Sequence, residues 1–158
     1  MILKYLSFAI ALIFMSFIVG MVMTSILRKT DFYNKTLANL NLIKSEVLNK
    51  IIGIGVIKWI VKNTFFKFFN QKLKIDGKIN LTELKIIRNE MTKSEIDHLF
   101  AFIFVCIFII IKLYNQEYLF AFIILIVNIL MNIYPSLLQQ QNKRRIDNLI
   151  KRFKIGKR

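Results

Sequence analysis

The chain has 158 residues, of which 56% are hydrophobic and 21% are charged. Soluble domains usually contain roughly 45–50% apolar residues, and disordered chains contain fewer. Lys and Arg number 24 against 9 Asp and Glu, which gives a formal net charge of +15. A single cysteine excludes an internal disulfide framework and cannot alone form a structural zinc site. Because the apolar excess gathers in three nearly uncharged blocks, the composition indicates a small, basic membrane protein.

The first apolar block runs from Leu3 to Leu27 and carries no charge between Lys4 and Arg28. Its roughly 23 uncharged residues exceed the 20 or so that cross the hydrocarbon of a bilayer. A cleaved signal peptide is the alternative, but its apolar core would be unusually long and no small-residue cleavage motif follows it. We therefore expect residues 1–27 to form the first membrane-spanning helix.

Two further apolar blocks follow near the C-terminus. Tyr118–Leu138 is uncharged and long enough to cross a membrane, whereas Leu99–Ile111 is too short to do so alone. Thr92 and Glu95 match a capping box, in which each side chain bonds to the backbone N–H of the other residue. A helix that begins at this box and ends near Leu113 would be long enough to span.

Residues 92–138 are therefore predicted to form an antiparallel helical hairpin, with its turn at Lys112–Glu117. Lys and Arg concentrate between Arg28 and Lys93 and again in Lys143–Arg158, and such residues favour the cytoplasmic side. The predicted fold is an all-α membrane protein, a single membrane domain over residues 1–158. It has three spans, with the N-terminus outside and the C-terminus inside.

The segment 28–91 is expected to lie in the cytoplasm or at the membrane interface. Ile51–Phe69 is apolar but is interrupted by lysines, and it contains Trp59. This pattern is typical of an amphipathic helix lying in the interface, with lysine stems reaching toward the headgroups. A helix packed on the spans and a fourth span are the alternatives.

Two shorter elements are predicted after this helix. Asp76 and Gly77 sit between alternating apolar residues, a pattern that favours a tight hairpin turn, although an isolated two-stranded hairpin is marginally stable. Leu81–Met91 is expected to form a short amphipathic helix capped by Asn80 or Thr82.

The tail, residues 139–158, is strongly basic and carries apolar residues at helical spacing. It therefore predicts an amphipathic helix suited to anionic lipid headgroups. Nucleic acid also attracts basic segments, but a basic segment beside a span is better explained by membrane orientation and lipid, so no nucleic-acid partner is expected.

Polar residues inside the predicted spans mark a candidate site, because such groups are costly in a bilayer. His98 and Asn132 lie 17 residues before and after Asn115, at the centre of the hairpin turn, so they are expected at the same depth. Asn128, Asn132 and Gln139 share one face of the third span by their spacing, as Glu95 and His98 do on the second. These faces are predicted to meet in one polar pocket, near which Pro135 distorts the helix.

Each of these residues could also serve only the structure of the protein, without a role in catalysis or binding. Glu95 could serve only in the capping box, His98 could be a hydrogen-bonded interfacial histidine, and the asparagines could hydrogen-bond between helices. Cys106 is expected to fill apolar space, since nothing nearby would lower its pKa. The sequence contains no motif for a metal or a tightly bound cofactor, and none is expected.

The same residues resemble the glycosyl-4,4'-diaponeurosporenoate acyltransferase family over roughly residues 88–150. These are small bacterial membrane proteins that transfer a fatty acyl group to a sugar hydroxyl of a glycosylated carotenoid. One family motif is matched by Glu90, Lys93, Glu95 and His98. A second is matched by Asn132, Pro135, Gln139, Asn142, Lys143 and Arg145.

The resemblance implies a multi-pass acyltransferase of the bacterial inner membrane that acts on a lipid or glycolipid acceptor. His98 is then the expected general base, with Glu95 orienting its ring and with Asn132 and Gln139 bonding an oxyanion or a sugar hydroxyl. Glu90, Lys93, Asn128 and Asn142 are further candidates to contact substrate. Lys143, Arg144 and Arg145 are candidates to hold the phosphates of an acyl-CoA or acyl carrier protein donor.

Two other classes of function remain open at this stage. The chain could be a non-catalytic subunit or scaffold beside a larger membrane enzyme, in which case its polar residues would be fully paired with one another. A transporter or channel component is less favoured, because no span carries a charge at its middle.

Overall fold

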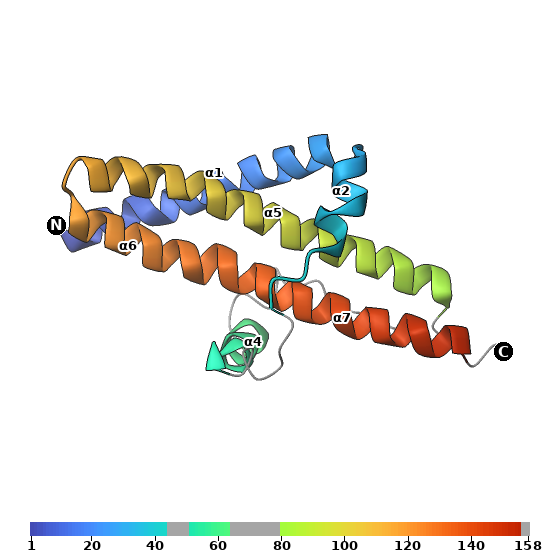
Figure 1. The fold of residues 1–158 in the computed structure, drawn as a ribbon. Coiled ribbons are helices and arrows are strands. Elements are labelled where there is room, and N and C mark those ends of the chain that lie inside the picture. Colours follow the sequence, from blue (N-terminus) through green and yellow to red (C-terminus); the bar gives the residue numbers. More distant parts are fainter. Residues whose placement is uncertain (44–50, 64–79, 156–158) are drawn as a thin grey trace. The chain divides into compact units, whose positions relative to one another are not determined.

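A computed structural model of the chain describes residues 1–43, 51–63 and 80–155. All regular structure in these described ranges is helical, which confirms the predicted all-α class. The elements in chain order are α1 (Ile2–Leu27), α2 (Asp31–Lys35), η1 (Leu37–Asn39), α4 (Ile54–Asn63), α5 (Leu81–Tyr114), α6 (Tyr118–Asn128), the π-helical segment η3 (Ile129–Ile133) and α7 (Tyr134–Ile155) (Figure 1).

Three helical stretches are long and apolar enough to cross a membrane, as predicted. They are α1, α5, and the continuous run from α6 through α7. At 1.5 Å per residue the 34 residues of α5 measure about 51 Å, more than the roughly 30 Å thickness of the hydrocarbon. A part of α5 therefore extends beyond any membrane that it crosses. The orientation with the N-terminus outside stays a prediction.

The start of α5 corrects one expectation. Asn80 Oδ1 accepts a hydrogen bond from the amide of Glu83 at 2.8 Å, and the Glu83 carboxylate accepts one from the Asn80 amide at 3.5 Å. This is a capping box, and it confirms Asn80 as the cap. Thr92 does not begin a helix, because its hydroxyl donates to the carbonyl of Arg88 at 2.9 Å within α5. The predicted short helix and second span are therefore one helix.

The third span and the basic tail are also continuous rather than separate. α6 passes into the π-helical segment η3, and α7 then runs on to Ile155. Pro135 has no N–H to donate to the carbonyl four residues earlier, so the wider turn lies where an α-helical bond is lost. The expected distortion near Pro135 is thus a change in helix type, and the helix does not end at Leu138.

The turn between α5 and α6 forms where the sequence predicted it. Gln116 adopts a positive φ of 60°, and the amide of Glu117 donates to the carbonyl of Lys112 at 2.9 Å. Lys112 Nζ also lies 3.0 Å from Glu117 Oε1 and 4.6 Å from the centroid of the Phe120 ring. The charge that interrupts the apolar sequence is therefore paired at the tip of the hairpin.

The chain divides into two compact units. The first contains Met1–Leu40 and Lys93–Ser136, and the second contains Asn41–Thr92 and Leu137–Arg158. The earlier expectation of one membrane domain over residues 1–158 stays a prediction.

In the first unit, α1 packs along α6 and comes close to the α5 backbone at Gly20. Ser16, Gly20 and Thr24, each four residues from the next, are all buried. Small residues at this spacing allow helix backbones to approach closely in apolar surroundings. The apolar core that this arrangement supports contains Ala9, Leu12, Ile13, Val105, Ile109, Phe120, Ala121 and Ile124.

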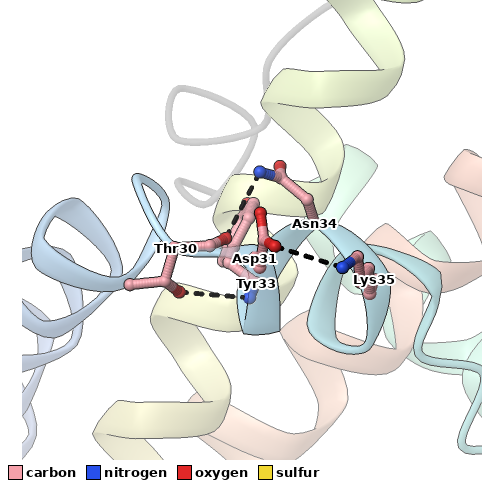
Figure 2. A network of polar contacts seen from close by, with 5 residues as sticks. All are labelled: Thr30, Asp31, Tyr33, Asn34 and Lys35. Atoms are coloured by element: carbon pink, nitrogen blue, oxygen red, sulfur yellow. Dashed lines mark hydrogen bonds and ion pairs between the residues drawn. The ribbon is translucent and has the colours of Figure 1, made fainter.

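A short helix, α2, follows α1 in the same unit. The Thr30 hydroxyl caps it by accepting a hydrogen bond from the amide of Tyr33 at 3.3 Å (Figure 2). Lys35 pairs with Asp31 one turn away at 3.1 Å, an exposed contact of small energetic value (Figure 2). Tyr33 is buried and packs in one apolar cluster with Ile96 of α5, which ties this segment to the spanning helix.

In the second unit, the tail packs against protein. Ile146 is buried with Leu84 and Met91 of α5, and Leu149, Ile150 and Phe153 pack on the same cluster. Arg88 Nε also lies 2.6 Å from Asp147 Oδ1. The apolar face expected to lie on lipid is therefore covered by α5, because a protein face buries it more completely than headgroups do.

Only part of the predicted interfacial helix lies in the described ranges. α4 covers Ile54–Asn63, and the Trp59 side chain is exposed, as an interfacial anchor would be. Residues 64–69 and the predicted turn at Asp76 and Gly77 lie outside the described residues.

The close approach of α1 and α5 generates the first prediction. A Cβ added at Gly20 would overlap the main-chain carbonyl oxygen of Asp97 and lie 3.3 Å from the amide nitrogen of Ala101. Because both obstacles are backbone atoms, we expect Gly20→Ala to lower the unfolding free energy by about 1–3 kcal/mol. Chemical unfolding in detergent micelles, followed by circular dichroism, measures this loss.

Gly55→Ala is the matched control, because a Cβ there meets nothing within 4 Å. This change lies within α4, where alanine favours the helix by up to about 1 kcal/mol. Equal stabilities of Gly20→Ala and the unmodified chain would contradict the close helix contact.

Candidate active site

A cluster of buried polar side chains forms inside the first unit. Asn128 of α6, Asn132 of η3 and Ser16 of α1 are all fully buried. Asn132 Nδ2 donates to Asn128 Oδ1 at 2.8 Å and to Ser16 Oγ at 3.5 Å. Asn128 Nδ2 donates to the carbonyl of Phe102 in α5 at 3.2 Å. Together with His98, these three side chains are called the polar cluster below.

These contacts determine which way each carboxamide faces. An amide nitrogen carries two hydrogens, whereas the amide oxygen only accepts. The nitrogen of Asn128 must face the Phe102 carbonyl, which leaves its oxygen to accept from Asn132. The nitrogen of Asn132 then uses both hydrogens, on Asn128 and Ser16. Both hydrogens of the Asn132 amide are thus used within the protein, and its predicted contact with an oxyanion or a sugar hydroxyl stays a prediction.

His98 lies beside the carboxamide of Asn132, and the two side chains interact. His98 Nδ1 and Asn132 Oδ1 are both buried, and neither makes a hydrogen bond of normal geometry to another described residue. Phe17 of α1 meets the imidazole edge-on, with ring centroids 5.4 Å apart and planes at 90°. The His98 side chain as a whole is half-buried. The structure thus brings His98 and Asn132 together, as their equal distances from the hairpin turn suggested.

Two acidic residues lie close to His98 on α5. Glu95 is fully buried, and its main-chain carbonyl accepts a hydrogen bond from Ser136 Oγ at 3.2 Å. It lies one turn before His98, on the same helix face. Asp97 interacts electrostatically with the imidazole, although the sequence analysis did not select it.

The predicted cations of the second unit have different surroundings from one another. The Gln140 carbonyl oxygen accepts from the amide of Ile43 at 3.0 Å, and the Arg144 guanidinium donates to the carbonyl of the same residue. Lys143 is only 3% exposed, whereas Arg145 is exposed. Consecutive helical residues point about 100° apart, so these three side chains leave α7 in different directions, and their role in holding a donor's phosphates stays a prediction. Of the three, Arg145 is the one with an exposed side chain.

Gln139 was predicted to share the helix face of Asn128 and Asn132, but the buried face of this helix passes through Gln140. Buried polar residues recur instead at Asn128, Asn132, Ser136 and Gln140, each four residues after the last, and Gln139 is half-buried. A π-helical turn holds more residues than an α-helical turn, so η3 moves the buried position forward by one residue.

The remaining predicted residues are distributed over both units. Lys93 lies in the first unit and is half-buried, whereas Glu90 and Asn142 lie in the second, where Glu90 is exposed and Asn142 is half-buried. Cys106 is half-buried, with Sγ 3.8 Å from Asn128 Nδ2.

Sequence reasoning missed the contribution of α1 to the polar cluster. Ser16 and Phe17 lie more than 80 residues before His98, so spacing within the hairpin could not include them. The series Ser16, Gly20, Thr24 was a usable signal, because small residues at intervals of four mark a helix-packing face. That face would have placed Ser16 against the hairpin.

These features define a membrane protein, helical throughout its described residues, that holds two buried carboxamides beside a half-buried imidazole among its apolar helices. A family model described as glycosyl-4,4'-diaponeurosporenoate acyltransferase matches residues 29–152. The match covers most of the 158 residues, and the chain belongs to this family, which confirms the resemblance noted from its motifs. Neither a curated protein nor a solved structure matches the chain.

The contrast between Arg144 and Arg145 can be tested directly. We expect Arg144→Ala to lower the unfolding free energy by about 1.5–3 kcal/mol, the range for hydrogen bonds to charged groups, because it removes the donor to Ile43. Arg145→Ala, which truncates an exposed side chain, is expected to change it by less than about 0.5 kcal/mol. Urea unfolding of both variants in micelles measures the difference, and equal stabilities would contradict the assigned contact.

Proposed function

We propose that this protein is a membrane O-acyltransferase that moves a fatty acyl group to a sugar hydroxyl of a glycosylated carotenoid or a similar lipid. Membership in the acyltransferase family supports the reaction class. We assign the general-base role to His98, the one histidine of the chain, because of where its side chain lies. Its Nδ1 is buried beside Asn132, while the side chain as a whole remains partly exposed.

An imidazole held in this way suits general-base catalysis. In the proposed reaction the acceptor hydroxyl oxygen attacks the carbonyl carbon of the acyl donor while His98 Nε2 takes the hydroxyl proton. With a thioester donor, the carbon–sulfur bond then breaks, and the imidazolium returns the proton to the leaving thiolate. The proposed donors are acyl-CoA and acyl carrier protein, which both carry thioesters.

The other residues of the first unit support the same role for His98. The buried oxygen of Asn132, which lies beside the imidazole, is proposed to accept a hydrogen bond from His98 Nδ1–H and so to orient the ring, in place of the oxyanion role suggested by the sequence. Asp97 supplies a carboxylate that interacts with the imidazole and lies near the charge that forms during proton transfer. Glu95 adds a second carboxylate one helical turn away, although its burial favours a supporting rather than a substrate-contacting role.

The acceptor is proposed to approach from the bilayer. Helices of the first unit expose large apolar side chains, among them Ile103, Ile107, Phe122 and Ile126. Such surfaces are compatible with lipid chains and with a carotenoid. In the second unit, Gln139, Asn142 and Arg145 remain the candidates to contact the polar parts of substrates, since Lys143 is buried and Arg144 contacts the main chain.

A non-catalytic scaffold is the competing function. The bonds between Asn128, Asn132 and Ser16 favour it, because asparagines also join helices in proteins with no catalytic role. The scaffold predicts that His98 can be replaced without loss of function.

The test is acyl transfer by membranes that contain the protein, a labelled acyl thioester and a glycosylated carotenoid acceptor. We expect His98→Gln to lower the rate by about 10²–10⁴-fold, the usual contribution of a general base. The matched control is Ile86→Ala, an exposed apolar position on the same helix but outside the first unit, which should keep the full rate. An active wild type combined with an equally active His98→Gln would show that His98 is not the base.

A further inference from the structure

Asn128 lies four residues before Asn132 and is fully buried. The proposed reaction assigns it no direct task, yet its polar atoms are all engaged. Its nitrogen donates to the Phe102 carbonyl at 3.2 Å and lies 3.8 Å from Cys106 Sγ, and its oxygen accepts from Asn132 at 2.8 Å. A side chain so completely bonded in apolar surroundings has one stable orientation.

We propose that Asn128 is a positioning residue that fixes which nitrogen of His98 carries the proton. The carbonyl of Phe102 orients Asn128, Asn128 orients Asn132, and the oxygen of Asn132 accepts a hydrogen bond from His98 Nδ1–H. The neutral imidazole then has an unprotonated Nε2. This inference rests on the proposed function, because a base that acts through Nε2 needs this tautomer.

The reverse orientation of Asn132 is disfavoured by the same contacts. Rotating its carboxamide by 180° would place its oxygen against Asn128 Oδ1, where two acceptors would meet without a hydrogen. It would also present an N–H to His98 Nδ1 and so favour the proton on Nε2, which removes the base. The direction of one hydrogen bond between two asparagines therefore determines whether Nε2 can accept a proton.

The chain offers an unusually clean measurement, because His98 is its single histidine. Full-length protein labelled with ¹⁵N-histidine in lipid nanodiscs gives one pair of ring nitrogen signals. Their chemical shifts distinguish the two neutral tautomers under mildly alkaline conditions, in which the imidazole is neutral. We expect the wild-type spectrum to show the proton on Nδ1.

Three variants separate positioning from packing. Asn128→Leu removes the acceptor for Asn132, so we expect the Nε2–H form of His98 to appear. We also expect kcat to fall at least tenfold while KM stays nearly unchanged. For comparison, a wrong histidine tautomer costs up to about 10⁴-fold in hydrolytic triads. Asn128→Asp, protonated in this apolar site, retains an acceptor for Asn132 and a donor for Phe102, so it should restore the Nδ1–H form and most of kcat. Ile124→Val removes a buried methylene one turn earlier and should change neither quantity.

The outcomes distinguish this inference from the proposed function. A wild-type spectrum with the proton on Nε2 overturns the inference whatever the activity, and so does Asn128→Leu with an unchanged tautomer. An Nδ1–H wild type that responds to Asn128→Leu, together with a fully active His98→Gln, leaves the positioning network standing and removes the catalytic role. Loss of stability in Asn128→Leu without a change of tautomer assigns Asn128 to packing alone.

Discussion

The arrangement of the first unit depends on the cost of burying polar groups among apolar helices. A carboxamide surrounded by hydrocarbon must bond to protein, because little water is present to replace a missing partner. Asn132 meets this requirement with contacts to residues from α1 and α6, and Asn128 meets it with a carbonyl of α5. The same bonds that join these helices also leave one amide oxygen beside the imidazole. Helix association and site geometry are thus consequences of one hydrogen-bonding requirement.

The many basic residues of the second unit suggest a surface that binds anions, but several of them instead make contacts within the protein. Arg88 pairs with Asp147, Arg144 bonds to the main chain of Ile43, and Lys143 is buried. These three cations are used within the protein, and the tail's apolar residues cover α5. The net positive charge of the tail still favours anionic surfaces, but its basic side chains differ in how exposed they are and therefore in whether they can contact such a surface.

Much of this structure follows from local sequence, and the exceptions have physical causes. Apolar length placed the three spanning stretches, and the polar turn at Lys112–Glu117 placed the hairpin that brings His98 and Asn132 together. Thr92 was predicted to cap a helix, but its hydroxyl donates a hydrogen bond to the main-chain carbonyl of Arg88. A Thr hydroxyl can make this bond inside a continuous helix, so its presence does not mark a helix start. The buried position lies at Gln140 rather than Gln139 because of the π-helical turn η3, and the spacing of the side chains does not predict such a turn. For the contacts from α1, the sequence offered small residues at intervals of four, which mark a helix-packing face but do not name the residues that it meets.

The part played by α1 has a consequence for any attempt to dissect this protein. The family match begins at residue 29, just beyond α1, yet Ser16 and Phe17 contact the asparagine and the histidine of the hairpin. A fragment trimmed to residues 29–152 would leave a hydrogen of the Asn132 amide without its Ser16 partner and would remove Phe17 from the edge of the imidazole ring. The N-terminal helix α1 is therefore a structural part of the candidate site, in addition to being a candidate membrane span.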